Sequence, residues 1–366
     1  MGSFAALLSC VGIARADVLA LLAQHVDGFM PVPGTQRVKP IFDRSDLVCM
    51  CTAESTHTAV QDGLWDSAAG RPVARVTTTI TFAIAIAYKE TRSVTQQLAI
   101  RLVEDSPLPL PPQVPFKKGQ PFLLFLVSIS PTMYETADRF LGMNLFSIIP
   151  AGPAAGGFSG LEMTLAQIVA KPNREDKLRA LELLEGFDAV SQQTKTLMWR
   201  IADSDDFEIA MTAWAVLLKS KSPKVVTGLL GYLNAHPPPQ EPTLALIGVT
   251  EGLSAIRDER DLATLEQLAS SKYFEIRSGA LYALRGMKDP RSIRTLIQGL
   301  DDERPELRYR ALITLAEILS LRKYEGDYAP SMYLFDKDPQ YYIGLWKQWW
   351  ADEGSKLYPP ASSPNR

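Results

Sequence analysis

The chain has 366 residues, more than one hydrophobic core usually serves, so its length predicts two domains. The hydrophobic fraction of 46% and the charged fraction of 22% are typical of soluble globular proteins. A net charge of −3 leaves no basic surplus, and the sequence has no stripe of Lys and Arg, so we expect no nucleic-acid partner. Three cysteines cannot form a disulfide framework.

Residues 1–36 form an N-terminal segment with two interpretations. Residues 4–13 are apolar and an Ala-Arg-Ala sequence ends at residue 16, which predicts a signal peptide over 1–16 and an exported, periplasmic protein. A Leu-Leu-Ser-Cys sequence resembles a bacterial lipobox and would make Cys10 a lipid anchor, the one route by which we expect membrane attachment. The alternative is a cytoplasmic protein with an amphipathic helix that continues through 17–27.

Residues 37–150 are predicted to form an antiparallel β barrel or sandwich. The run from Pro72 to Lys89 is rich in Thr, Val, Ile and Phe, and large residues alternate with alanines between Phe82 and Ala87. This alternation suits a tight barrel wall or a strand covered on both faces. The other predicted strands are Asp46–Ser55, Val94–Val103, Gln120–Ser130 and Leu145–Ile149.

The proline-rich stretch Ser106–Pro115 is predicted to be an extended surface loop, because proline cannot donate to a strand ladder. Gly119 follows as a turn into the apolar run PFLLFLV. This order of strands and loop resembles the OB-like barrels of the netrin and metalloproteinase-inhibitor type, over about 100 residues. The sequence lacks the disulfides and the N-terminal cysteine of that family.

Small residues fill 151–160 and predict a linker between two domains. Beyond it, a small residue recurs at one helical position, and a large apolar residue follows it by three or four places. Ala or Gly at that position lets a neighbouring helix approach closely. The residues in register are Ala180, Ala213, Gly248, Ala280 and Ala311. Partner helices are predicted between them, at 189–202, 223–234, 261–270 and 290–300.

Residues 289–318 (DPRSIRTLIQGLDDERPELRYRALITLAEI) closely resemble a HEAT repeat, the armadillo-like helical hairpin unit. Phe274–Met287 resembles the second half of the same repeat. The resemblance implies an α-solenoid over residues 161–352, with a tail at 353–366. Ser222, Asp289 and Asp338 each precede a proline and are predicted to cap a helix.

Arg277 and Arg308 occupy equivalent positions in two repeats. In HEAT-like repeats such arginines pair with an aspartate of a neighbouring turn, here Asp302, so the resemblance implies a structural ladder and not a ligand clamp.

Residue types that could carry chemistry do not assemble into a catalytic motif. Cys49, Cys51 and His57 offer three metal-ligand types but no fourth, and the cysteines suit a buried strand, so we expect no metal. The three histidines lie outside any His-Glu pair, which excludes the di-iron hydroxylases among HEAT-like proteins. Ser159 lies in a Gly-Phe-Ser-Gly sequence that lacks the spacing of a nucleophile elbow. We therefore predict no enzyme activity and no cofactor.

An aromatic face on the last predicted helix, 338–352, is the most unusual segment. It contains Tyr342, Trp346, Trp349 and Trp350. One hypothesis makes this face an anchor for a partner, because Trp and Tyr dominate binding hot spots. The alternative makes the helix a cap that buries its aromatic rings against the last repeat.

Together these patterns predict an α+β chain with an N-terminal β barrel and a C-terminal HEAT-type solenoid. The predicted function is that of a bacterial, non-enzymatic scaffold or adaptor that binds a protein or peptide along the solenoid groove. The alternative places an enzyme or inhibitor function in the β domain, with the solenoid as its support.

Overall fold

A computed structural model describes residues 38–66, 71–90, 97–107, 118–130, 133–137, 143–150, 156–236, 245–319 and 328–359. The chain divides into two compact units, Met1–Leu197 and Met198–Arg366, and each is considered by itself. The predictions for residues 1–36, including the signal peptide and the lipid anchor at Cys10, lie outside the described residues, as do most of the proline-rich stretch and residues 360–366 of the tail.

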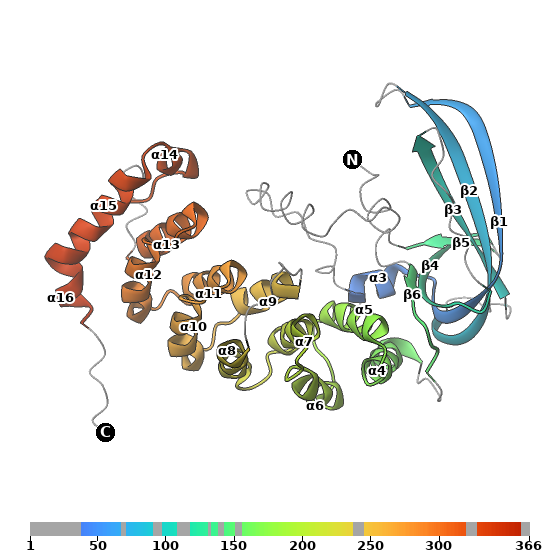
Figure 1. The fold of residues 1–366 in the computed structure, drawn as a ribbon, viewed down its shortest axis with the longest axis horizontal. Helices are drawn as coiled ribbons and strands as arrows, with labels where there is room; N and C mark the ends of the chain where they lie inside the picture. Colours follow the sequence, from blue (N-terminus) through green and yellow to red (C-terminus); the bar gives the residue numbers. More distant parts are fainter. Residues whose placement is uncertain are drawn as a thin grey trace. The chain divides into compact units, whose positions relative to one another are not determined.

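The first unit contains a closed barrel of five strands (Figure 1). Neighbours pair in the order β1-β2-β3-β5-β4, and β4 pairs with β1 to close the ring. All these pairings are antiparallel except that of β3 with β5. A short sixth strand, β6, adds to β4. The strands are β1 Leu47–Asp66, β2 Arg71–Glu90, β3 Gln97–Pro107, β4 Pro121–Ser130, β5 Met133–Thr136 and β6 Met143–Leu145.

Alternation of side chains fills the barrel interior, as the period of two along a strand requires. β1 contributes Leu47, Cys49, Cys51 and Ala53 to the buried cluster. On β2, Phe82 is fully buried and its ring packs edge-on against Phe122 of β4, at 5.4 Å between centroids. The alternating run on β2 therefore forms a barrel wall, and the β-barrel prediction is confirmed.

β1 is much longer than the predicted strand, because it continues past Ser55 to Asp66. The added residues pair with β2 in regular register as far as Gln61, for example Thr58 opposite Thr78, and an irregularity follows between Gln61 and Leu64. Residues 55–61 are all exposed, on both sides of the strand. A strand segment without a buried face has no need to alternate apolar with polar residues. The sequence of this segment therefore carries no pattern that predicts a strand.

The predicted linker is wrong at its C-terminal end, because residues 157–160 form the first turn of helix α4, Gly157–Val169. Phe158 stacks on Phe187 at 4.3 Å between ring centroids and packs edge-on against Phe42 of α3, Val38–Arg44. These aromatic contacts order a segment whose small residues suggested a loop. Ser159 consequently lies within a helix and not on an exposed elbow.

Helix α5, Arg174–Glu185, follows α4 in the same unit and is the first of the predicted repeat helices. Its carboxylate Asp176 accepts a hydrogen bond of 2.9 Å from the backbone N–H of Ser147, just beyond β6. The boundary between units at Leu197 falls within α6, Gln192–Ile201.

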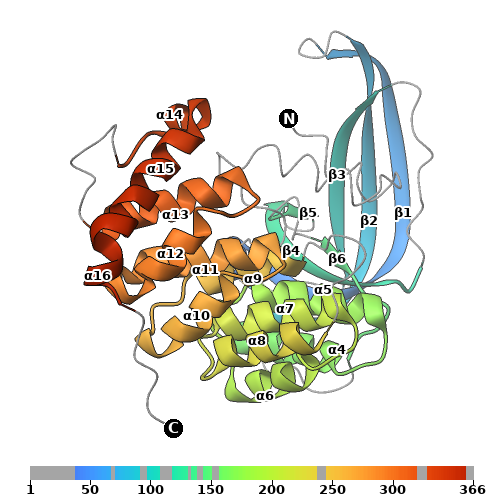
Figure 2. The ribbon, with the colours of Figure 1, turned by 60° about the vertical axis from the view of Figure 1, so that its left-hand side comes forward.

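The second unit is helical, and the prediction of a mostly helical C-terminal half is confirmed (Figure 2). Helices α7, α9, α11 and α13 pack against one another in chain order, and we call them the odd-numbered layer. Helices α8, α10 and α12, the even-numbered layer, pack on α7, α11 and α13. The bounds are α7 Phe207–Lys219, α8 Val225–Ala235, α9 Ala245–Ser254, α10 Leu262–Leu268, α11 Phe274–Met287, α12 Ile293–Gly299 and α13 Pro305–Ile318. Each predicted helix from residue 207 to residue 318 is present.

Glycines set the closest approaches within the odd-numbered layer. A Cβ atom added to Gly252 on α9 would lie 2.6 Å from Cβ of Leu218 on α7. A Cβ atom on Gly279 of α11 would lie 2.9 Å from the carbonyl oxygen of Thr250 on α9. Small residues therefore do permit close packing, although the tightest contacts fall beside the predicted register and not on it.

Two of the three predicted caps are confirmed. The side chain of Asp289 accepts from the N–H of Arg291, and that of Asp338 accepts from the N–H of Tyr341. Ser222 is wrong as a cap, because α8 begins after Lys224 in a left-handed conformation and the Ser222 hydroxyl has no partner among the described residues.

Candidate functional site

The aromatic residues predicted to bind a partner lie on helix α15, Pro339–Trp349, and turn mostly inward. Trp346 is fully buried, and its indole N–H donates to the carbonyl oxygen of Tyr328 at 3.0 Å. Tyr342 is also buried, whereas Trp349 and Trp350 are half-buried. This arrangement favours the capping hypothesis over an exposed aromatic anchor.

Contacts to α12 hold the end of α15 in place. The ammonium of Lys347 pairs with Asp301, just after α12, and the guanidinium of Arg294 lies 5.7 Å from the ring centroid of Trp350. A π-helical turn, Trp350–Gly354, follows, and a Cβ atom on Gly354 would lie less than 3 Å from both indole rings of Trp349 and Trp350. The tail therefore begins later than predicted, after helix α16, Ser355–Leu357.

Different aromatic residues face solvent at this end of the chain. Tyr333 of α14, Met332–Lys337, is 67% exposed and Tyr341 of α15 is 52% exposed. The ammonium of Lys337 lies 4.2 Å from the ring centroid of Tyr333. Neither tyrosine is among the residues predicted to bind a partner, although Tyr341 precedes the buried Tyr342 by one position, about 100° around the helix.

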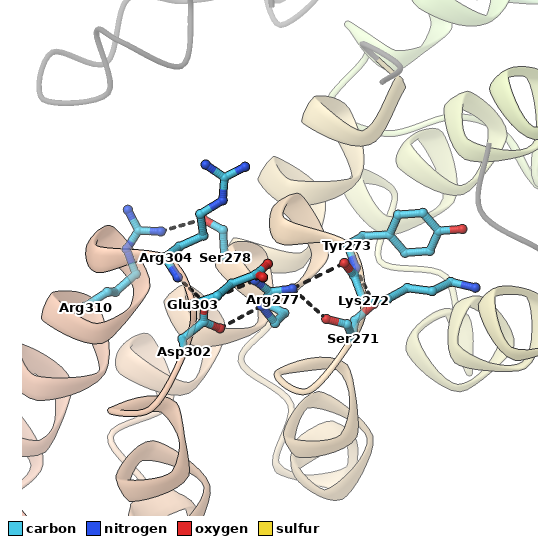
Figure 3. Close-up of polar contacts among 9 residues, drawn as sticks. All are labelled: Ser271, Lys272, Tyr273, Arg277, Ser278, Asp302, Glu303, Arg304 and Arg310. Carbon is cyan, nitrogen blue, oxygen red and sulfur yellow. Dashed lines mark hydrogen bonds and ion pairs between the residues drawn. The ribbon is translucent and has the colours of Figure 1, made fainter. Parts of the chain in front are cut away.

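The pair of Arg277 with Asp302, one member of the predicted ladder, is present (Figure 3). Its Nε and a terminal nitrogen donate to the two carboxylate oxygens of Asp302, at 2.7 and 3.1 Å. The other terminal nitrogen donates to the carbonyl oxygens of Ser271 and Lys272. Both charged side chains are about nine-tenths buried, so the pair ties α11 to the turn before α13 from the inside.

Arg308 does not repeat this pattern. Within the described residues, its buried Nε–H has no hydrogen-bond partner, in contrast to the fork that Arg277 forms on Asp302. The equivalence that the sequence predicted for the two arginines therefore holds for their position in the helix and not for their contacts.

Charged side chains also join the helices of the odd-numbered layer. Lys219 of α7 pairs with Glu251 of α9 at 3.1 Å. Arg285 of α11 makes a two-pronged pair with Glu317 of α13, at 2.8 and 2.6 Å. These four residues are only partly buried, so they form a polar stripe across this layer, which we call the charged stripe.

Arg310 of α13 lies beside the charged stripe and has a different environment. One terminal nitrogen donates to the hydroxyl of Tyr282 at 2.6 Å. The other donates to the hydroxyl of Ser278, as Figure 3 shows. The guanidinium carbon lies 3.7 Å from the ring centroid of Tyr282. Burial lowers the pKa of Arg310 from its ordinary value.

The metal-ligand types in the barrel do not converge. Cys49 and Cys51 are free, fully buried thiols with their sulfur atoms 2.6 Å apart, whereas His57 is exposed on the extension of β1. Burial raises the pKa of the Cys51 thiol. The described residues contain no group of three or more His, Cys, Asp or Glu side chains placed to hold a metal ion.

Comparisons with known proteins give no family for this chain. No family model and no curated protein matches it. Two crystal structures of engineered proteins, each 16% identical to it, have TM-scores of 0.29 and 0.23. The first match covers 51% of this chain and 58% of the engineered one, and the second covers 52% and 80%. Similarity at this level supports no assignment of fold or function.

Across the part of the chain that the structure describes, no helix is both long enough and apolar enough to span a membrane.

Proposed function

We propose that the helices of the second unit form a HEAT-type solenoid, that α4 to α6 are repeat helices of the same type, and that the barrel is OB-like. Two features support this finer assignment. Alternate helices pack in chain order as stacked repeats do. The barrel has the five strands of an OB-fold, and one parallel pairing interrupts an otherwise antiparallel ring.

We propose that the protein is a non-enzymatic scaffold that binds a protein or peptide across the odd-numbered layer. The observation that supports this proposal is the charged stripe with Arg310 beside it, because these partly exposed side chains join neighbouring helices of the odd-numbered layer. Charged and aromatic side chains on a rigid array of helices can fix the position of a partner along the array. They lose little conformational entropy on binding, because the helices already hold them in place.

Site-specific photo-cross-linking in the source cells tests this function. A photoreactive amino acid is placed in the full chain at Ile247 or Ser254, two partly exposed positions on α9 in the odd-numbered layer. Control chains carry it at Gln267 on α10 or Gln298 on α12, two exposed positions of the even-numbered layer. We expect a discrete cross-linked product from the α9 positions and none from the controls.

The same product from all four positions, or none from any of them, would contradict binding across the odd-numbered layer.

Export from the cytoplasm is also a proposal. The mass of the protein isolated from its source tests it, because cleavage after residue 16 or lipid on Cys10 changes that mass by a defined amount.

A further inference from the structure

Arg310 of α13 is a partly buried cation of the odd-numbered layer, and its hydrogen bonds within the described residues include none to a carboxylate. The two arginines of the neighbouring helix α11 are paired instead, Arg277 with Asp302 and Arg285 with Glu317. The two hydrogen bonds of Arg310 go to neutral hydroxyls, those of Ser278 and Tyr282. A guanidinium taken from water without a counter-ion is costly, and such a group is normally paired or bound to a ligand.

The remaining donors of Arg310 suit an anion that arrives from outside. A guanidinium has five N–H groups in a planar fork, and Arg310 uses one terminal nitrogen for each of the two hydroxyls on α11. The ring of Tyr282 lies against the guanidinium and holds its plane. A fork that is fixed in this way loses little freedom when a planar, two-oxygen anion binds it.

Charge balance favours a carboxylate over a phosphate. Arg285, a cation that acts on Arg310, is already paired with Glu317. Glu306, one turn earlier on α13, adds a negative charge that acts on Arg310. The site therefore offers at most the single positive charge of Arg310, partly offset by Glu306, which suits a singly charged carboxylate better than a phosphate with up to two negative charges at neutral pH.

We propose that Arg310 binds the side-chain carboxylate of an Asp or Glu residue in an extended peptide segment of the partner, where Tyr282 and Ser278 orient the guanidinium. This inference rests on the proposed scaffold function and names the chemistry that the scaffold recognises. Arg310 is on α13 and both hydroxyls are on α11, so the acidic residue would lie over the crossing of these two helices.

Selection of random 12-residue peptides displayed on phage, with the full chain immobilised, provides the probe. We expect the enriched peptides to share an Asp or Glu at one position. Binding of a synthetic enriched peptide should weaken at least 10-fold in the Arg310→Met variant, and equally when that acidic residue is changed to its amide. The two changes together should weaken binding no more than either alone, since both remove the same contact.

Three controls separate the interpretations. Arg310→Lys keeps the positive charge but not the planar fork, so this variant should bind the peptide with intermediate affinity. Its remaining binding would also show that a substitution at position 310 leaves the fold intact. Arg260→Met removes an exposed arginine outside the odd-numbered layer and should leave peptide affinity unchanged. A peptide with phosphoserine in place of the acidic residue should bind no more tightly than the original.

The outcomes distinguish the two proposals. Peptides that bind without a shared acidic position, or equally well to Arg310→Met, would overturn the role of Arg310 and leave the scaffold function standing. Tighter binding of the phosphoserine peptide would overturn the choice of a carboxylate. Failure to enrich any peptide, with no cross-linked product from α9, would overturn both.

Discussion

Replacing Arg277 by Met should destabilise the helical unit by about 3 kcal/mol, because the change leaves Asp302 buried without its counter-ion. Asp302 is only 10% exposed, and breaking one side of a buried pair typically costs about 3–5 kcal/mol. The lower end applies because Asp302 still accepts a hydrogen bond from the backbone N–H of Arg304. The carbonyl oxygens of Ser271 and Lys272 also lose a donor.

Urea unfolding followed by tryptophan fluorescence measures this effect, because five of the six tryptophans lie in the second unit. A loss of about 3 kcal/mol corresponds to a midpoint lower by roughly 1–3 M urea. The double variant Arg277→Met, Asp302→Asn should recover part of the loss, since neither charge is then left alone. Arg260→Met, which breaks an exposed pair with Asp258, is the matched control and should leave the midpoint unchanged.

A loss below about 1 kcal/mol in Arg277→Met would refute the structural role of the pair, as would a double variant whose loss equals the sum of the two single losses.

Three further outcomes are expected. Gly252→Ala should be less stable than Gly231→Ala by about 1–3 kcal/mol in urea unfolding, because only the first Cβ meets a neighbour, Leu218, and equal stabilities would contradict the close crossing. Burial raises the pKa of Tyr88 to about 12, so its neutral form contributes stability below pH 10 that is lost as pH rises towards 12. In the Tyr88→Phe variant, the Tm measured by calorimetry should fall less steeply as the pH rises over that range. A fall as steep as in the unchanged protein would refute the contribution of Tyr88. Asp338→Ala should lose about 1 kcal/mol of capping and speed hydrogen exchange in the first turn of α15, and unchanged exchange there would exclude the cap.

The helices were predictable because each has a buried stripe that repeats with the helical period. Leu307, Ala311 and Leu315 of α13 are all buried, as their spacing indicates. The extension of β1 was not predictable, because residues 55–61 are exposed on both sides and carry no alternation. The start of α4 was missed for another reason, since only the packing of Phe158 against Phe42 and Phe187 distinguishes it from a small-residue linker.

The candidate site was only partly predictable for a similar reason. The pair of Arg277 with Asp302 follows from the repeat pattern, which the sequence displays. The environment of Arg310 depends on which residues of α11 face α13, and one sequence does not show that. The aromatic face on α15 was found, but whether Trp346 points inward or outward depends on the contact that its indole makes with Tyr328.

The pairing of the strands and helices implies that the two units fold by different kinetics. The ion pairs of the charged stripe join residues 32 positions apart, 219 with 251 and 285 with 317, so each new helix meets its neighbour soon after synthesis. The barrel closes only when Leu47 pairs with Leu126, 79 positions later. Contacts between distant residues slow folding because a long loop must first be closed. During translation, the start of β1 therefore stays unpaired on the edge that will meet β4 until β4 has been synthesised. The helices, in contrast, can assemble in the order in which they emerge from the ribosome.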